Sequence, residues 1–303
     1  MKLELDNISV ELKKSITFNE DLSRYSWFNL GGPSQVFFRP DNLKQLSEFL
    51  IKKGNIFKKI SILGAGSNTL IRDGGISGLT IKLSSKFSYL NLIDDNIIEA
   101  GASTLDKKVS NFAAENSLAG FEFLSCIPGT IGGAIMMNSG CYNQKISDIL
   151  ISFNVVDLNG KMKEIKKNEI EFFYRGNNLP NNYVITSAKF KGIQSKKEEI
   201  ILKKNKFTDQ KKNNQPSQVK TCGSTFKNPA NKKAWQLIKN AKCENLFVGD
   251  AKISKKHCNF FINEGKATAA NIEELIEKVK KQVFDKSGIK LELEIKIVGN
   301  KNQ

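Results

Sequence analysis

The chain reads Leu63-Gly64-Ala65-Gly66-Ser67-Asn68-Thr69-Leu70-Ile71 at the end of a short apolar run, Ile60–Leu63, that predicts a buried strand. Glycines in such a turn remove the side chains that would keep a phosphate at a distance, so successive backbone N–H groups can point at an anion. The spacing matches neither the Gly-x-Gly-x-x-Gly fingerprint nor the Gly-Lys-Ser/Thr ending of a Walker loop, which excludes both of those nucleotide-binding classes. Taken alone, the stretch also suits a tight structural turn.

A second glycine-rich segment follows further along the chain and reads Ile127-Pro128-Gly129-Thr130-Ile131-Gly132-Gly133-Ala134. Its glycines again leave the backbone open to a ligand. Two such loops in one domain favour a long ligand that combines a pyrophosphate with flat rings. We therefore expect a large phosphorylated cofactor.

The rest of the chain mixes strand and helix patterns without a regular alternation. The expected helices cover residues 43–50, 104–116, 231–241 and 271–287, and the expected strands cover residues 79–83, 97–100, 149–157, 161–165, 183–190 and 291–297. Asn159-Gly160 joins two of these strands as a hairpin. This mixture indicates an α+β fold rather than a doubly wound sheet. Lysine, glutamate and asparagine dominate residues 195–220, so we place a domain boundary near residue 195.

The net charge is strongly positive, with 47 Lys+Arg against 31 Asp+Glu over 303 residues. Such a balance invites a polyanion-binding function. Only four of these basic residues are arginines, however. Recognition of the bases of nucleic acids relies on the planar guanidinium group, which lysine lacks. A solvated lysine-rich surface is the favoured interpretation, and a lysine-rich module that binds polyanions is the alternative.

The five cysteines form no Cys-x-x-Cys pair, and no secretory signal pattern precedes them. We therefore expect reduced thiols in a cytoplasmic protein. No apolar run approaches the roughly 18 residues that cross a bilayer. The single histidine, His257, excludes a metal site built from several histidines, and we expect no metal.

The two glycine loops, together with motifs that follow them in order over about residues 25 to 299, closely resemble the UDP-N-acetylenolpyruvoylglucosamine reductase (UDP-N-acetylmuramate dehydrogenase) family. The further motifs are Met137-Asn138-Ser139-Gly140, Phe173-Tyr174-Arg175, Gln215-Pro216, Cys222-Gly223-Ser224-Thr225-Phe226-Lys227-Asn228-Pro229, His257-Cys258-Asn259-Phe260 and Leu293-Glu294-Ile295. The short distance from Ser224 to Glu294 indicates the shorter form of the family, which lacks an inserted tyrosine-bearing loop.

The resemblance implies an FAD-binding domain of the vanillyl-alcohol-oxidase (PCMH) type in two subdomains, residues 1–84 and 85–195. An α+β substrate-binding domain, residues 196–303, would follow, and its last strand would return Glu294 to the active site. FAD would be held by Gly64, Ala65, Gly66, Ser67, Asn68, Thr69, Pro128, Gly129, Thr130, Gly132, Gly133 and Ala134. Since related flavoproteins sometimes tether FAD through a histidine, and residues 1–256 contain none, we expect a non-covalent flavin.

The activity implied is the NADPH-dependent reduction of UDP-N-acetylglucosamine enolpyruvate to UDP-N-acetylmuramate, with hydride transferred from reduced FAD. This oxidoreductase step serves peptidoglycan synthesis, and through it cell wall biogenesis, cell shape, cell division and the cell cycle. A different flavin oxidoreductase on the same scaffold is the main alternative. We expect a monomer without nucleic-acid or membrane partners.

Three residues match the catalytic positions of the family. Ser224 would donate the proton that follows the hydride, a task for which a hydroxyl suffices only beside a strongly basic carbanion or enolate in a dry pocket. Arg175 would stabilise the enolate through paired charge-assisted hydrogen bonds, and Glu294 would assist. Because Glu292 shares a strand face with Glu294, alternation alone does not exclude it.

The substrate-binding residues implied by the resemblance are Tyr174, Lys212 and Asn228. Lys212 lies in a lysine-rich stretch and suits a solvent-exposed position equally well. His257 is expected to be a hydrogen-bonded structural histidine.

Overall fold

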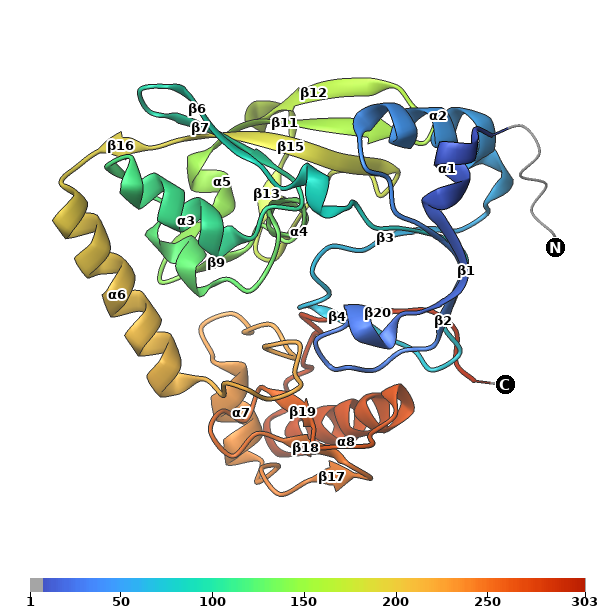
Figure 1. Ribbon diagram of the computed structural model, residues 1–303. Helices are drawn as coiled ribbons and strands as arrows, with labels where there is room; N and C mark the ends of the chain where they lie inside the picture. Colours follow the sequence, from blue (N-terminus) through green and yellow to red (C-terminus); the bar gives the residue numbers. More distant parts are fainter. Residues whose placement is uncertain (1–7, 303) are drawn as a thin grey trace. The chain divides into compact units, whose positions relative to one another are not determined.

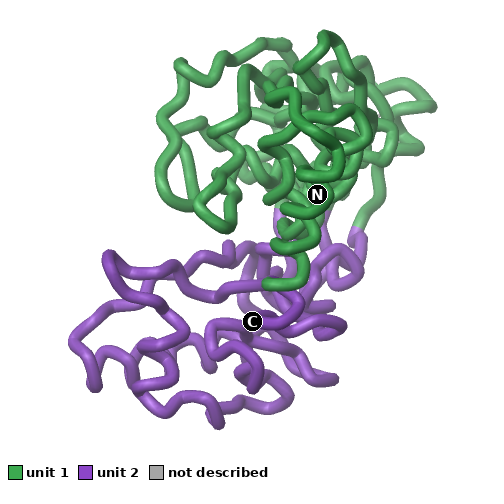
Figure 2. Tube along the Cα trace, turned by 90° about the vertical axis from the view of Figure 1, so that its left-hand side faces the viewer, with its two compact units in different colours: residues 1–18, 36–65, 78–210 green, residues 19–35, 66–77, 211–303 purple. Residues whose placement is uncertain are grey.

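The computed structural model describes residues 8–302, which divide into two compact units. Of the described residues, unit 1 comprises 8–18, 36–65 and 78–210, and unit 2 comprises 19–35, 66–77 and 211–302 (Figure 2). Both units mix helices and strands, so the α+β class expected from the sequence is confirmed. The domain boundaries at residues 84 and 195 stay a prediction.

Unit 1 is built on a five-stranded antiparallel sheet. Its strands follow one another in the order β12 (Met162–Lys166), β11 (Leu150–Asp157), β15 (Tyr183–Lys191), β7 (Ile97–Gly101) and β6 (Leu90–Asp94). Figure 1 shows helices α3 (Asp106–Glu115), α4 (Ile131–Met136) and α5 (Ile146–Ile149) on one side of this sheet. Their apolar side chains form one buried core with those of the strands, and this core fixes the loop that precedes α4.

A second sheet contains, in order, β1 (Ile16–Asp21), β2 (Pro33–Phe38), β5 (Ile76–Ile81) and β3 (Ile60–Ile62). Helix α2 (Leu43–Lys53) is preceded by Asn42, whose side chain accepts the N–H of Gln45 at 2.9 Å and so caps the helix. Its buried face packs with residues of β2 and β5, where the rings of Phe38 and Phe49 stack with centroids 4.1 Å apart. This packing places the end of β3, and the glycine loop that follows it, at the edge of the sheet.

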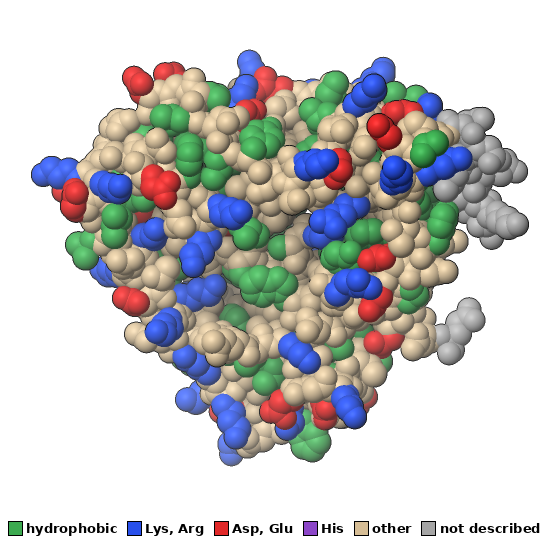
Figure 3. All heavy atoms as spheres, in the orientation of Figure 1, with side chains coloured by type: hydrophobic (Ala, Val, Ile, Leu, Met, Phe, Trp, Pro, Cys, Tyr) green, Lys and Arg blue, Asp and Glu red, His purple; other side chains and the backbone are tan. Residues whose placement is uncertain are grey.

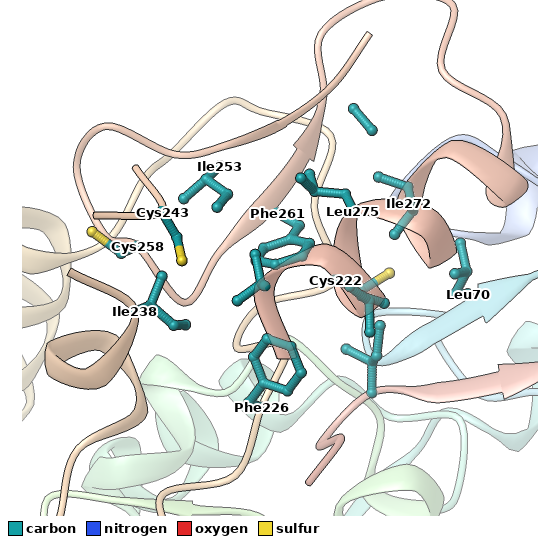
Figure 4. Close-up of a cluster of buried hydrophobic side chains, with 14 of the residues drawn as sticks. Leu70, Cys222, Phe226, Ile238, Cys243, Ile253, Cys258, Phe261, Ile272 and Leu275 are labelled. Atoms are coloured by element: carbon teal, nitrogen blue, oxygen red, sulfur yellow. The ribbon is translucent and has the colours of Figure 1, made fainter. Parts of the chain in front are cut away.

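Unit 2 has its own core around helix α8 (Ala269–Ser287). The sheet β17-β18-β19 (Phe247–Val248, Ala251–Ile253, Phe261–Asn263) and helix α7 (Ala234–Asn240) contribute to this core. Figure 4 shows Phe226, Phe261 and Leu275 among its buried side chains. Strand β20 (Lys296–Val298) pairs in parallel with β4 (Thr69–Ile71), so the last strand of unit 2 lies beside the residues that follow the first glycine loop.

The remaining elements are short. They are α1 (Val10–Lys14), β8 (Leu118–Ala119), β9 (Gly140–Cys141), β10 (Gln144–Lys145), β13 (Phe172–Phe173), β14 (Gly176–Asn177) and β16 (Ile193–Gln194).

Two predictions from the sequence differ from the structure. Residues 197–214 form a long helix, α6 (Lys197–Asn214), that was not predicted, because Ile200 is its one buried residue and it has no apolar stripe. The predicted strand 291–297 is shorter, since β20 begins at Lys296. Residues 291–295 instead make an isolated bridge between Leu293 and Phe226.

Basic and acidic side chains both occur over the face of the molecule that Figure 3 shows. Lysines on α8 form local ion pairs: Nζ of Lys278 lies 2.8 Å from Oε1 of Glu274, and Nζ of Lys280 lies 2.8 Å from Oε1 of Glu277. In the described part of the chain, no helix combines the length and apolar character that a bilayer span requires. Among the same residues, no cluster of three or more His, Cys, Asp or Glu side chains could hold a metal ion.

Candidate active site

The first glycine loop begins in unit 1, where β3 ends. The carbonyl oxygen of Gly64 accepts a hydrogen bond from the ammonium group of Lys82. A Cβ atom on Gly64 would lie 3.0 Å from Oγ1 of Thr130, so the start of the first loop lies against the second loop. Within the described residues, the backbone N–H groups of Gly64 and Ala65 have no acceptor. They are available to a ligand.

The loop continues in unit 2 with Gly66, whose φ of +68° favours glycine. A Cβ atom there would lie 1.8 Å from the carbonyl oxygen of Tyr25, so a side chain is excluded by contact as well as by conformation. The carbonyl of Gly66 accepts the N–H of Trp27 at 3.2 Å. The N–H groups of Gly66 and Ser67 donate to no acceptor in the described chain, so unit 2 also presents unpaired backbone donors.

The second glycine loop is held in unit 1 by short antiparallel pairing with the residues before α3. The N–H of Asp106 donates to the carbonyl of Gly129 at 3.1 Å, and the N–H of Ile131 donates to the carbonyl of Thr104 at 3.0 Å. A Cβ atom on Gly133 would lie 3.6 Å from Oγ1 of Thr130, the same hydroxyl that lies next to Gly64. The two loops therefore converge on this threonine.

The donor set of the two loops fits a pyrophosphate. The N–H groups of Gly129, Thr130 and Gly133 have no acceptor among residues 8–302, as in the first loop. Side chains are absent at the glycines, and the hydroxyl of Thr130 lies where the loops meet. A phosphorylated cofactor such as FAD would accept hydrogen bonds from these groups.

Asp106 lies directly behind the second loop and was not predicted as a site residue. Its side chain is fully buried, and neither carboxyl oxygen has a hydrogen-bond partner within the described chain. A Cβ atom on Gly129 would lie 2.7 Å from Oδ2 of Asp106, which explains the glycine at this position. Burial raises the pKa of the Asp106 carboxyl well above its ordinary value, which favours the neutral form over the charged one.

Arg175 lies in a two-residue turn between β13 and β14, with a φ of +60° that is rare for a residue with a side chain. Its Nη1 donates to the carbonyl of Gly140 at 3.1 Å, and its guanidinium lies 5.1 Å from the ring centroid of Tyr174. Backbone strain of this kind occurs preferentially at functional sites.

Two asparagines attach this hairpin to the end of α4. Nδ2 of Asn177 donates to the carbonyls of Ile135 and Met136 at 2.8 and 3.2 Å, and Nδ2 of Asn138 donates to that of Phe173 at 3.0 Å. Unit 1 therefore connects Tyr174 and Arg175 to the same helix that follows the second glycine loop.

Unit 2 brings Ser224 and Glu294 together on neighbouring segments. The N–H of Glu294 donates to the carbonyl of Thr225 at 2.8 Å, and Ser224 is bridged to Phe260 on its other side. The buried amide of Asn259 holds Phe226 at both its N–H and its carbonyl, at 3.0 and 2.8 Å. These bonds fix the segment that carries Ser224.

The first glycine loop lies against the same segments of unit 2. Nδ2 of Asn68 donates to the carbonyl of Glu294 at 3.1 Å, and the carbonyl of Asn68 accepts the N–H of Lys296 at 2.9 Å. The thiol of buried Cys222 donates to the carbonyl of Thr69 at 3.3 Å. Unit 2 therefore joins residues 66–69, which were predicted to bind the cofactor, to two of the predicted catalytic residues.

The structure separates the two glutamates that sequence alternation left equivalent. The side chain of Glu292 is 78% exposed and lies 3.6 Å from Nζ of Lys227, as in an ordinary surface ion pair. Glu294 is partly buried and lies next to Asn68. This difference favours Glu294 as the site carboxyl.

The predicted substrate-binding residues differ in their surroundings. Tyr174 is 51% exposed. Oδ1 of Asn228 accepts the N–H of Ala234 at 3.0 Å and so contributes to the start of α7. Lys212 is exposed in the last turn of α6, and its carbonyl accepts Nζ of Lys256. Their roles toward a substrate stay a prediction.

His257 is hydrogen-bonded, as expected, since its Nδ1 accepts the N–H of Asn259 at 3.3 Å. Its ring packs edge-on against Phe260 with centroids 4.8 Å apart, and burial lowers the pKa of the imidazole. These contacts are consistent with a histidine that stabilises the fold, and its role toward a substrate stays untested by them.

The loops and their unpaired N–H groups suit a phosphorylated cofactor, and residues 34–166 match the family described as an FAD binding domain, so the chain belongs to the flavoproteins. Residues 215–298 match the C-terminal domain of UDP-N-acetylenolpyruvoylglucosamine reductase. The reductases of that name from Pelagibacter ubique and Rickettsia bellii (strain RML369-C) are similar to this chain. The first is 47% identical over 97% of this chain and 98% of its own length, and the second is 43% identical over 92% of each.

A solved structure of UDP-N-acetylenolpyruvylglucosamine reductase from Thermus caldophilus superposes with a TM-score of 0.81 at 30% identity. It covers 93% of this chain and 97% of its own. The chain belongs to the UDP-N-acetylenolpyruvoylglucosamine reductase family, which confirms the resemblance found in the sequence.

Proposed function

We propose that this protein reduces UDP-N-acetylglucosamine enolpyruvate to UDP-N-acetylmuramate, with NADPH as the source of electrons and non-covalently bound FAD as cofactor. The observation that carries this proposal is 47% identity to a reductase of this name over nearly the whole of both chains. We further propose that it acts as a monomer in the cytoplasm, in the synthesis of peptidoglycan precursors.

FAD, when bound, supplies the hydride chemistry of the reaction. The chain's own contribution begins with the two glycine loops, whose unpaired N–H groups would hold the pyrophosphate in place. Residues 1–256, which include both glycine loops, contain no histidine, and this supports a non-covalent flavin.

Ser224 is proposed to donate a proton to the substrate carbon next to the carboxylate. Its hydroxyl makes no side-chain hydrogen bond within the described chain, so no neighbouring group marks it as a nucleophile. Its segment is fixed on both sides, by Phe260 and by the backbone of Glu294. A fixed hydroxyl can protonate a strongly basic carbon even though it is a weak acid in water.

Arg175 and Glu294 are proposed to stabilise the negative charge that develops on the substrate carboxylate. The guanidinium can form two parallel hydrogen bonds to a carboxylate, which a lysine cannot do. The strained φ at Arg175 and its bond to Gly140 restrict the directions in which the side chain can extend. Tyr174, Lys212 and Asn228 are proposed to bind the rest of the substrate, and the positive net charge would attract its diphosphate.

The proposal is tested by measuring NADPH consumption by the purified yellow protein with and without the enolpyruvyl sugar. We expect consumption to require the sugar and to yield UDP-N-acetylmuramate in equal amount. Oxygen-dependent turnover that does not require the sugar would instead identify a different flavin oxidoreductase. A colourless protein that binds nucleic acid tightly and in a salt-sensitive manner would identify a polyanion-binding module.

A further inference from the structure

Lys82 is a charged residue at the first glycine loop to which the proposed reaction assigns no task. It follows strand β5, and its backbone N–H donates to the carbonyl of Phe38 at 3.0 Å. Its ammonium group donates to the carbonyl oxygen of Gly64, the first residue of the loop. Lysine ammonium groups usually lie in solvent, so a partly buried one that binds a backbone carbonyl is uncommon.

The hydrogen bond from Lys82 fixes the orientation of one peptide unit. In a planar trans peptide the C=O and the following N–H point in opposite directions, and the described chain contains no cis peptide. Because the carbonyl of Gly64 faces Lys82, the N–H of Ala65 faces away from it. That N–H has no acceptor within residues 8–302.

We propose that Lys82 is a positioning residue for the cofactor phosphates: its ammonium group holds the Gly64 carbonyl so that the N–H of Ala65 faces the pyrophosphate of FAD. The positive charge also polarises this peptide, which makes its N–H a stronger donor toward an anion. The inference rests on FAD binding by the two loops, as proposed above.

The charges around Lys82 are consistent with this task. Burial, together with the like charge of Arg39, lowers the pKa of the Lys82 ammonium to about 8. Asp41 follows Arg39 by two residues and Lys86 follows Lys82 by four, and the side chains of Asp41 and Lys86 form an ion pair with each other at 2.9 Å. An anionic ligand nearby would favour the charged form of Lys82, and reciprocally the charged form would favour the ligand.

The test measures the dissociation constant of FAD for the apoprotein by quenching of flavin fluorescence, between pH 6.5 and 9.5. Lys82→Met removes the charge and the donor, Lys82→Gln keeps a donor without the charge, and Lys161→Met is the matched control at an exposed lysine of unit 1. At pH 7 we expect Lys82→Met to weaken binding roughly 10- to 100-fold, the scale of one charge-assisted hydrogen bond. Lys82→Gln should lie between it and the wild type, and Lys161→Met should bind as the wild type does.

The pH profile distinguishes a positioning role from a purely structural one. Below pH 8 Lys82 is charged, so wild-type affinity should be greatest there and should decline as the pH rises above 8. The decline should be absent in both Lys82 variants. A folded Lys82→Met protein that binds FAD within twofold of the wild type, or a wild-type profile without a decline above pH 8, would overturn the inference. If the wild-type apoprotein bound no FAD at all, both this inference and the proposed function would fail.

Discussion

Gly66 offers a direct test of the first loop, because the structure separates two costs of adding a methyl group there. Gly66 and Gly288 both have a φ of +68°, so Gly→Ala introduces the same backbone strain at either position, about 1–2 kcal/mol. At Gly288, the C-cap of α8, a Cβ atom meets nothing within 4 Å. At Gly66 it would lie 1.8 Å from the carbonyl oxygen of Tyr25, which forces the backbone to move. Overpacking of this kind costs about 1–3 kcal/mol more.

We therefore expect Gly66→Ala to lose about 2–5 kcal/mol of stability and Gly288→Ala about 1–2 kcal/mol, from the strain and overpacking scales together. The assay is thermal unfolding of the two apoproteins combined with their FAD dissociation constants. Because the loop donors must shift with the backbone at Gly66, FAD binding should be lost in Gly66→Ala and kept in Gly288→Ala. Equal melting temperatures with unchanged FAD affinity in both variants would refute the contact argument.

Three further predictions concern the proposed catalytic residues and the buried acid. Ser224→Ala should leave the reduction of the flavin by NADPH nearly unchanged and slow its reoxidation by the sugar roughly 10²- to 10⁴-fold, measured by stopped-flow absorbance; equal slowing of both steps would count against a proton donor. Arg175→Lys should lower the rate of sugar reduction roughly tenfold or more although it keeps the charge, because the paired hydrogen bonds are lost, and wild-type rates would contradict this. Asp106→Asn should remove a pH dependence of stability. Because the folded state raises the pKa of Asp106, the contribution of this group to the free energy of unfolding is greatest at acid pH. It falls as the pH rises, by at most about 1.4 kcal/mol per pH unit. Urea unfolding at pH 5 and pH 8 measures the free energy of unfolding of both proteins. Relative to the wild type, Asp106→Asn should be more stable at pH 8 than at pH 5, and the same difference at both pH values would refute the prediction.

The sequence predicted those elements whose apolar pattern is strong. The helix at 271–287 is found as α8, because its apolar residues recur on one face and pack into the core of unit 2. The hairpin around Asn159-Gly160 is found as β11 and β12, with a φ of +77° at Gly160. In both cases the local pattern and the tertiary packing favour the same structure.

Helix α6 could not be predicted in this way, since its few apolar residues do not recur along one face and only Ile200 is buried. Residues 291–295 have the alternation of a strand, yet they pair with single residues rather than with a long neighbour. The residues with which they pair lie in segments distant in the chain, and a local sequence pattern carries no information on such pairing.

The glycine loops and the three proposed catalytic positions were predicted because their motifs occur together in one order. Lys82 and Asp106, which contact those loops, carried no such signal. One is a lysine among 43, and the other is an aspartate at the start of a helix, where this residue is common. Their relation to Gly64 and Gly129 depends on tertiary contacts.

The most direct test of the proposed activity is a single turnover without oxygen. The protein is reduced, freed of NADPH, and mixed with one equivalent of UDP-N-acetylglucosamine enolpyruvate while the flavin absorbance is recorded. We predict that the oxidised flavin spectrum returns and that one equivalent of UDP-N-acetylmuramate forms. A flavin that stays reduced in the presence of the sugar and is reoxidised only when oxygen is admitted would contradict the proposal.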